Sequence, residues 1–352
     1  AIDLDDVSAG NIAGAVFNGL NGERAGWDVS DAGDVNGDGL DDLLITTDES
    51  SNSTQSGNTY LVYGQTQEFV GNINLSNIES GYLDGAVFNF DMQVDNYGVG
   101  SSVSTAGDVN GDGYDDLIIG MTYASPHINR EGQVFLIYGQ ETSLTGKINL
   151  SGVINGQVQG AVFNGIDELD FMGENVSDAG DVNADGYDDL LIYSRYGNAH
   201  GFVTGEVFLI YGQADALTGE LELTDVTNGL IKGALFTGTD GYDWAGSSID
   251  GAGDVNGDGI DDFIIGVRGD ESKGIYTGAV YLIYGTTSDF SGTVDLIDVQ
   301  TGQVDGAVFL GIEEGDQVGR SCSFAGDVNA DGLSDIVIGA TWADSLGNFT
   351  GQ

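Results

Sequence analysis

The chain has 352 residues, and its 57 Asp and Glu residues against 8 Lys and Arg residues give a formal net charge of −49. So large a negative charge excludes a partner recognised through a phosphate backbone, and we expect no nucleic-acid binding. Hydrophobic residues make up 40% of the chain, which is enough for a large core.

Targeting and redox signals are sparse. No stretch approaches the roughly 18 apolar residues of a membrane span. The opening AIDLDDV lacks the basic region and apolar core of a signal peptide, so the start resembles that of a processed or excised fragment. Cys322 is the single cysteine. It lies in a predicted strand, where we expect a buried, inert thiol.

In chain order, short apolar segments recur in five repeats. In the second repeat they are 85–89, 100–108, 116–120 and 133–139, followed by a linker that contains 148–150. Each segment is rich in β-branched or aromatic residues and is bounded by Gly or Asn, which is typical of strands. No stretch has a helical period, so the sequence predicts an all-β protein.

The repeats keep a nearly constant spacing. A loop of the type AGDVNGDGxDD begins its Asp series at 34, 108, 181, 254 and 327, with steps of 74, 73, 73 and 73 residues. We therefore expect residues 1–352 to form one repeat-built domain, a β-propeller of four-stranded antiparallel blades, with five repeats visible and room for more in the complete protein. A sandwich or a parallel β-helix fits the spacing less well.

We expect the two ends of the chain to contribute to the fifth repeat together but not to complete it. The chain opens with the outer-strand segment GAVF, and it stops at Gln352, where every other repeat continues into an aromatic strand. We expect the fifth repeat to take its outer strand from the N-terminus and to lack its third strand. A continuation of the chain, or another chain, would fill that edge.

A glycine stands eight residues before each first Asp of the acidic loops. We expect this glycine to let neighbouring backbones approach closely near a central axis. The five glycines are Gly26, Gly100, Gly173, Gly246 and Gly319.

The acidic loops carry oxygen ligands at fixed positions, with a glycine at the sixth position that permits a sharp turn. Side chains at positions 1, 3, 5 and 9 and the backbone carbonyl at position 7 are the predicted ligands of about five calcium ions. The predicted side-chain ligands are Asp34, Asn36, Asp38 and Asp42; Asp108, Asn110, Asp112 and Asp116; Asp181, Asn183, Asp185 and Asp189; Asp254, Asn256, Asp258 and Asp262; and Asp327, Asn329, Asp331 and Asp335. The predicted carbonyl ligands are those of Leu40, Tyr114, Tyr187, Ile260 and Leu333.

An EF-hand and a metal-free turn cluster are the other interpretations of these loops. An EF-hand requires a Glu at position 12 and flanking helices, but position 12 is an isoleucine in every copy, as at Ile45. A metal-free cluster of Asx turns remains the alternative, although converging carboxylates repel one another without a cation. Calcium is favoured over magnesium because many fixed protein ligands suit it better. The acids at position 8, such as Asp41, are expected to point into solvent.

The acidic loop, the following DLIIG segment and the later aromatic strand resemble the FG-GAP repeat of the integrin alpha-subunit β-propeller and its bacterial relatives. This resemblance covers nearly the whole chain. It implies a propeller with calcium in the loops of one face, an extracellular or cell-surface location and a role in adhesion. The uniform repeats are similar to those of a bacterial member of the family.

The loops after DLIIG carry weaker signals. Cationic and aromatic residues suited to an acidic or neutral sugar form a possible ligand face, with ordinary loop variation as the alternative. Its residues are Tyr123, His127, Arg195, His200, Arg268 and Trp342. The tripeptide 268–270 reads Arg-Gly-Asp in a loop expected to be exposed, and coincidence is the favoured interpretation.

No catalytic constellation is visible, so we expect no enzyme. The leading hypothesis is a calcium-stabilised extracellular protein for adhesion or surface assembly, with a protein or glycan at the cell surface, or copies of itself, as partner. A carbohydrate-binding module is the alternative, and a polysaccharide lyase or hydrolase is less favoured.

Overall fold

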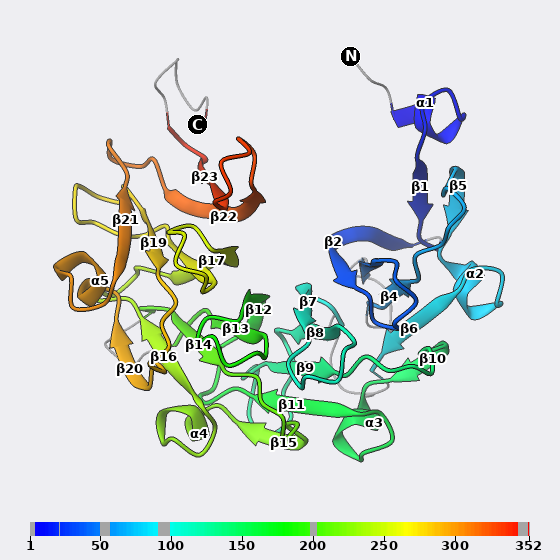
Figure 1. The fold of residues 1–352 in the computed structure, drawn as a ribbon, viewed down its shortest axis with the longest axis horizontal. Coiled ribbons are helices and arrows are strands. Elements are labelled where there is room, and N and C mark those ends of the chain that lie inside the picture. The colour runs from blue at the N-terminus through cyan, green and yellow to red at the C-terminus, as the bar shows by residue number, and fades with distance from the viewer. Residues whose placement is uncertain are drawn as a thin grey trace.

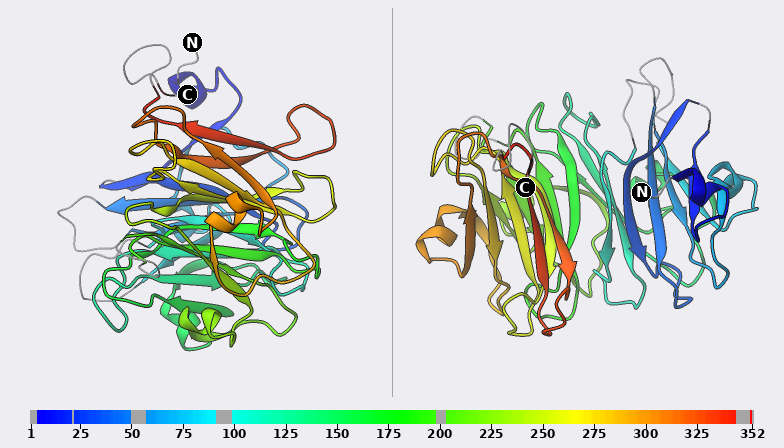
Figure 2. Two further views of the ribbon diagram at one scale, coloured as in Figure 1. Left: turned by 90° about the vertical axis from the view of Figure 1, so that its left-hand side faces the viewer. Right: turned by 90° about the horizontal axis from the view of Figure 1, so that it is seen from above.

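The structure is a computed structural model that describes residues 4–20, 22–49, 57–90, 99–197, 203–343 and 351. Strands dominate it, and they form several sheets that follow one another in chain order around a common centre (Figures 1 and 2). The all-β prediction is confirmed, and the arrangement is consistent with a β-propeller.

We number the sheets I to V. Sheet I contains β2 (Glu23–Gly33), β3 (Asp42–Glu49), β4 (Thr59–Val62), β6 (Gly85–Asn89) and β10 (Gly146–Asn149). Sheet II contains β7 (Val103–Gly107), β8 (Asp116–Met121), β9 (Gln133–Ile137), β11 (Gly160–Asn164) and β15 (Gly219–Glu222). Sheet III contains β12 (Met172–Gly180), β13 (Asp189–Ser194), β14 (Glu206–Ile210), β16 (Gly233–Thr237) and β20 (Gly292–Asp295).

The remaining sheets are smaller. Sheet IV contains β17 (Ala245–Gly253), β18 (Asp262–Val267), β19 (Ala279–Ile283) and β21 (Gly306–Leu310), and sheet V contains β22 (Val318–Gly326) and β23 (Asp335–Ala340). A separate N-terminal pair contains β1 (Ala15–Asn18) and β5 (Gly71–Asn74). The first strands of the five sheets, β2, β7, β12, β17 and β22, contact one another in sequence near the centre (Figure 1).

The sheets differ from the expected four-stranded blade in two ways. In the second to fifth repeats the GAVF segment pairs with the aromatic strand of the preceding repeat, as β6 pairs with β4, so sheets I to IV are shifted by one strand relative to the sequence repeat. In sheets I to III a fifth, parallel strand follows, formed by the linker segment, as β10 pairs with β6.

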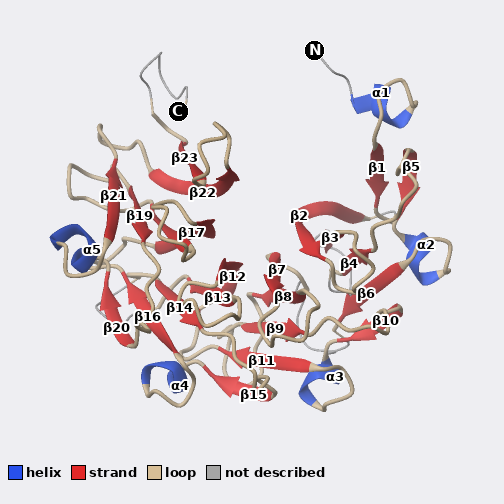
Figure 3. Ribbon diagram, viewed as in Figure 1, coloured by secondary structure: helices blue, strands red, loops and turns tan. Residues whose placement is uncertain are grey.

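The structure also contains short helical turns, which the sequence periodicity did not predict. They are α1 (Leu4–Ser8), α2 (Ser76–Glu79), α3 (Ser151–Ile154), α4 (Thr224–Thr227) and α5 (Ile297–Thr301). Each has only 4 or 5 residues, too few to show a period of 3.6. Figure 3 shows them at the outer rim of the molecule. Within the described residues, no helix is long and apolar enough to cross a membrane.

The expectation that the N-terminus completes the fifth repeat is wrong in this structure. Strand β1 pairs in parallel with β5, from Ala15 opposite Gly71 to Asn18 opposite Asn74. The same parallel pairing joins β6 to β10, so β1 follows the general rule for its repeat position. Among the described residues, sheet V contains β22 and β23, and β1 does not pair with either of them.

The core lies between neighbouring sheets. One buried cluster joins Leu44 of sheet I to Val103 and Leu117 of sheet II. Further clusters join sheets II and III, and sheets III and IV. The central strands are buried on both faces, which explains why they read as continuous apolar runs. Cys322 is 7% exposed, so its predicted burial is confirmed, and burial raises the pKa of the thiol to about 12.

Candidate functional site

Each acidic loop joins the first and second strands of its sheet, as residues 108–115 join β7 to β8. All five loops share one hydrogen-bond pattern. The two carboxylate oxygens of the first Asp accept the backbone N–H groups of the fifth and sixth residues; in the second loop Asp108 accepts those of Asp112 and Gly113 at 2.9 and 2.8 Å. The equivalent pairs occur in the other four loops. The sixth residue is a glycine with φ near 90°, as at Gly113, so the expected sharp turn is present.

In the first four loops the ninth residue anchors the loop to its sheet. Asp116 is fully buried, and its oxygens accept the N–H groups of Val109 in the loop and Gly139 after β9. Burial raises the pKa of Asp116 to about 8, and repulsion from Asp112 and Asp108 adds to the shift. The same causes raise the pKa of Asp189 to about 8. A cation at the loop would offset this repulsion.

The third and seventh residues of each loop are further predicted ligands. In the first four loops the Oδ1 atom of the third residue, such as Asn110, accepts the N–H of the fifth. In the fifth loop the Asn329 amide instead donates to Asp335. Among described residues, none donates a hydrogen bond to the carbonyl of the seventh residue, such as Tyr114.

Carboxylates alone do not complete a metal centre here. In the part of the chain that the structure describes, no three His, Cys, Asp or Glu side chains form a group that could hold a metal ion by themselves. A calcium ion at these loops would also require the Asn oxygen and the carbonyl at position 7, both oxygen donors of the type that calcium prefers.

The acids at position 8 were expected to point into solvent, and this expectation is wrong for three of the four. The Asp115 carboxylate reaches back to the preceding loop and accepts the N–H of Asp34 at 2.6 Å. Asp188 and Asp261 do the same for the preceding loops, at 2.7 and 3.1 Å. Burial is the main cause of the raised pKa of all three. Asp41, with no preceding loop in this chain, is exposed as expected.

This contact between loops explains a glycine of the AGD motif. Gly107 has φ of 63°, and a Cβ there would lie 2.2 Å from the Asp188 carboxylate. The glycine therefore makes room for the carboxylate of the next sheet, and neighbouring loops form a hydrogen-bonded chain along one edge of the molecule. We call each of these contacts an interloop clasp.

The glycines eight residues before the loops have a related role. All five have φ between 80° and 97°, and a Cβ on Gly246 would lie 2.2 Å from the Tyr193 ring. Four of the five have a neighbour within contact distance of that added atom, and Gly26 does not. Backbone atoms of a neighbouring sheet are among these neighbours at Gly173 and Gly319, so the expected backbone approach is confirmed there, whereas side chains fill the space at Gly100 and Gly246.

The opposite end of the same strands carries cationic and aromatic residues. Arg195 and Arg268 follow β13 and β18. The Arg195 guanidinium lies 3.0 Å from the Glu174 carboxylate, and that of Arg268 lies over the Trp244 ring, 4.8 Å from its centre. Burial lowers the pKa of Arg268 and raises that of Glu174, which the two arginines partly lower again.

Aromatic contacts connect part of the predicted ligand face. Tyr123 packs edge-on against Phe171, which packs against Tyr196, and Arg195 lies over the Tyr196 ring. The structure thus brings Tyr123, Arg195 and Arg268 into one region.

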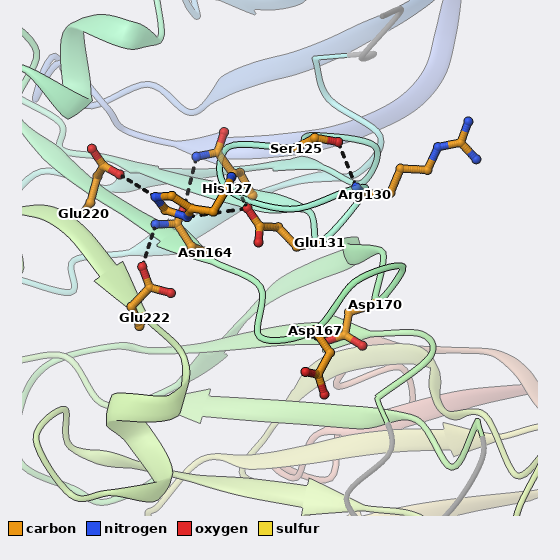
Figure 4. Close-up of polar contacts among 10 residues, drawn as sticks. Ser125, His127, Arg130, Glu131, Asn164, Asp167, Asp170, Glu220 and Glu222 are labelled. Carbon is orange, nitrogen blue, oxygen red and sulfur yellow. Dashed lines mark hydrogen bonds and ion pairs between the residues drawn. The ribbon is translucent and has the colours of Figure 1, made fainter.

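The other predicted face residues lie elsewhere or outside the description. His127 lies between Glu131 and Glu220 of the outer strand β15, with nitrogen–oxygen distances of 3.5 and 3.9 Å (Figure 4). Trp342 is 49% exposed at the end of sheet V, and His200 lies outside the described residues.

The tripeptide 268–270 is not displayed as a ligand. Asp270 is 6% exposed and accepts hydrogen bonds from the Ser272 N–H and the Tyr281 hydroxyl. The expected exposure is therefore wrong at Asp270, and the coincidence interpretation gains support.

Sequence reasoning missed a further acid, eleven residues before the first Asp of a loop. Asp170 accepts the N–H of Asp167, and Glu23, Asp243 and Asp316 cap equivalent turns. Burial, then repulsion from Glu206 and Asp167, raises the pKa of Asp170 to about 7. It also missed Glu174, Tyr193 and Trp244. The fixed spacing was a usable signal for the capping acids, whereas Glu174 has no acidic equivalent in the other repeats.

Comparison with known proteins agrees with this geometry. The family described as FG-GAP repeat matches residues 26–62, 99–137 and 319–352, each of which contains an acidic loop. The chain is 27% identical to integrin alpha-5 of Xenopus laevis over 60% of its length and 25% identical to integrin alpha-V of Gallus gallus over 77%. It is also 31% identical to a phosphatidylinositol-glycan-specific phospholipase D of Bos taurus over 49%.

These matches support an integrin-like FG-GAP domain. The matched region spans about a fifth of each of these relatives: 19% of integrin alpha-5, 22% of integrin alpha-V and 19% of the phospholipase D.

Proposed function

We propose that this chain is a calcium-stabilised, non-enzymatic module for adhesion or surface assembly, in which sheets I to V are blades of one repeat-built β-propeller. Similarity to integrin alpha chains fits a role in adhesion or at the cell surface. The extracellular location of this chain and the bacterial origin suggested by its uniform repeats belong to the same proposal.

One observation carries the calcium proposal: the five acidic loops share one backbone and carboxylate arrangement along one edge of the sheets. In each loop, the first, third, fifth and ninth side chains and the seventh carbonyl would hold one ion, giving about five ions. The ion would supply positive charge among carboxylates whose pKa values burial and mutual repulsion already raise.

Calcium titration with thermal unfolding tests this proposal. Calcium should raise the melting temperature, because at a free calcium concentration 100 times the dissociation constant each site stabilises the fold by about 2.7 kcal/mol. Asp181→Asn should lower the number of bound ions by one, and Asp305→Asn, an exposed acid outside the loops, should leave it unchanged. An equal melting temperature in calcium and in chelator would contradict the proposal.

The assembly proposal draws support from two open sheet faces. Val29 on sheet I is 62% exposed and Val337 on sheet V is 60% exposed, whereas their equivalents within the chain are buried. Each face is thus one half of an interface that recurs between the inner sheets. Sedimentation velocity should detect association of the chain that Val337→Asp weakens. If the chain stays monomeric at every concentration, the self-assembly part of the proposal is wrong and the adhesion part remains.

A carbohydrate-binding module is the second candidate, and the arginines and aromatic rings at the edge opposite the loops favour it. Glycan-array silence together with polymer formation would favour assembly instead. Because one relative is named as a phospholipase D, similarity alone does not decide against catalysis. Turnover assays on a panel of polysaccharides test the non-enzymatic proposal.

A further inference from the structure

Cationic charge gathers at one place in this acidic protein. Of its 8 Lys and Arg residues, Arg195, Arg268 and Arg320 lie close enough together for the first and third to shift the pKa of Arg268. Glu174 is the acid of this group, so the group has a formal charge of +2 in a chain with a charge of −49. We call these four residues, with Tyr193 and Trp244, the arginine cluster.

The arginine cluster has unused hydrogen-bonding capacity. Glu174 binds Arg195 through one oxygen, and its other oxygen and the Arg195 Nε are buried without a partner in the described structure. Within the same described part, the Arg268 guanidinium has no carboxylate partner, although it is half-buried against Trp244. Buried polar atoms and guanidinium groups of this kind usually have partners. A bound anion would supply acceptors for the Arg195 Nε–H and the Arg268 guanidinium, whereas the free Glu174 oxygen is itself an acceptor and would need a donor such as a hydroxyl group.

The fold itself does not require these arginines. At the repeat position of Arg195 and Arg268, the other repeats have Asp48, Thr122 and Thr341. Sheets I and V, which carry Asp48 and Thr341, have the same strand pairing beside this position as sheet III: Ala25 lies opposite Thr47 and Val318 opposite Ala340, as Met172 lies opposite Ser194. A structural role common to all repeats therefore does not account for the two arginines.

Aromatic rings border the arginine cluster. Trp244 packs between Tyr242 and Tyr276, with ring centres 5.9 and 6.0 Å apart, and these two tyrosines are 50% and 37% exposed. Trp244 has φ of 50°, a left-handed conformation that costs an aromatic residue about 1–3 kcal/mol. Exposed rings beside fixed guanidinium groups suit a ligand with both apolar ring faces and anionic groups.

We propose that the arginine cluster binds the carboxylate of an acidic saccharide, with Arg195 and Arg268 on the carboxylate and the neighbouring aromatic rings against the sugar. Trp244 and Glu174 act as positioning residues, because they hold the two guanidinium groups. This inference deepens the carbohydrate-binding candidate and is independent of the proposed calcium sites, which lie at the other end of the strands.

Isothermal titration of the whole chain in saturating calcium tests the proposal, with a hyaluronan hexasaccharide as probe. The probe should bind, and its carboxyl-reduced form should bind at least about tenfold more weakly. Arg268→Ala and Arg268→Lys should each weaken binding by about tenfold or more, because lysine keeps the charge but loses the planar fork. Lys147→Ala, which removes an exposed charge on β10, should change affinity less than about twofold.

Three results would overturn the proposal: no binding of the hexasaccharide by the folded wild-type chain, equal binding of the carboxyl-reduced probe, or undiminished binding by both Arg268 variants. A poly-glutamate peptide that binds in place of the sugar, with the same dependence on Arg268, would assign the cluster to an acidic protein instead. The calcium dependence of the melting temperature, measured on the same samples, separates a failure here from a failure of the calcium proposal.

Discussion

The inner sheets and the two end sheets have the same sequence pattern but different surroundings. Five residues before the first Asp of a loop, Val103 and Val176 are 4% and 5% exposed, whereas Val29 in sheet I is 62% exposed. Ten residues after that Asp, Leu191 is fully buried, whereas Val337 in sheet V is 60% exposed. Burial at these positions is therefore set by the neighbouring sheet, and the repeat alone does not determine it.

The difference teaches where the stability of the chain resides. Each inner sheet is covered on both faces, and its apolar residues belong to the clusters between sheets. Sheets I and V each present one such face to solvent. In a repeat protein the interfaces between neighbours carry much of the stability, so equivalent substitutions should differ in cost between the inner and end sheets.

A buried charge should give the largest difference in the free energy of unfolding between the inner sheets and the end sheets. Leu191→Asp places a carboxylate between sheets III and IV, and we expect it to cost about 4 kcal/mol or more, because the charge has no partner there. Val337→Asp occupies the same repeat position at an open face and should cost less than about 0.5 kcal/mol in the monomer. Urea unfolding checks both. Similar losses in the two variants would show that the face of sheet V is covered in solution.

Removing methyl groups at one repeat position gives a milder comparison with identical chemistry. Val103→Ala deletes two methyl groups from the core between sheets I and II and should cost about 2 kcal/mol. Val29→Ala deletes the same groups from an exposed face and should cost less than about 0.5 kcal/mol. The free energies of unfolding of the two variants measure the contribution of one neighbouring sheet. Equal values would refute the comparison.

The interloop clasp offers a polar version of the same test. Asp188→Ala removes the acceptor of the Asp108 N–H and should cost about 1 kcal/mol. Asp41→Ala removes the equivalent carboxylate at the open face, where it is exposed, and should be nearly neutral. Denaturant unfolding in calcium checks both variants. Asp188→Asn keeps an oxygen acceptor and should recover part of the loss; if it does not, the clasp depends on charge.

Much of this architecture was predictable from the sequence, because strands buried on both faces appear as apolar runs between glycines. Segment 85–89 coincides with β6, and segment 116–120 lies within β8. The acidic loops were found by their spacing, and the structure gives each the same hydrogen-bond pattern. Calcium in them stays a prediction.

The features that were missed depend on contacts between segments far apart in the sequence. The pairing of β6 with β4 and the clasp through Asp115 join residues of different repeats, and the parallel fifth strand joins the first segment of a repeat to its final linker, so the pattern of one segment does not reveal them. The arginine cluster was found only in part, because Glu174 and Trp244 approach the arginines through folding and not through spacing.

A pH dependence is expected from the turn that precedes β12 of sheet III. Burial raises the pKa of Asp170 to about 7, from an ordinary value of 3.8. A carboxyl with a raised pKa in the folded state contributes stability that is complete below the unfolded value and is lost as pH rises through the folded value. The wild-type chain should therefore lose stability from this group between about pH 4 and pH 7.

Asp170→Asn isolates this contribution because the amide keeps an oxygen acceptor for the Asp167 N–H but binds no proton. In saturating calcium, which holds the state of the loops fixed, the free energy of unfolding of the variant should fall less between pH 5 and pH 8 than that of the wild type. At pH 4 and below the two proteins should become similar, since Asp170 is then largely protonated in both the folded and the unfolded states, and the difference should grow as the pH rises toward 7. Parallel pH profiles would mean that Asp170 ionises near its ordinary value because water or local motion relieves its burial. The inner sheets would then be less tightly packed than the burial at the repeat positions of Val29 and Val337 indicates.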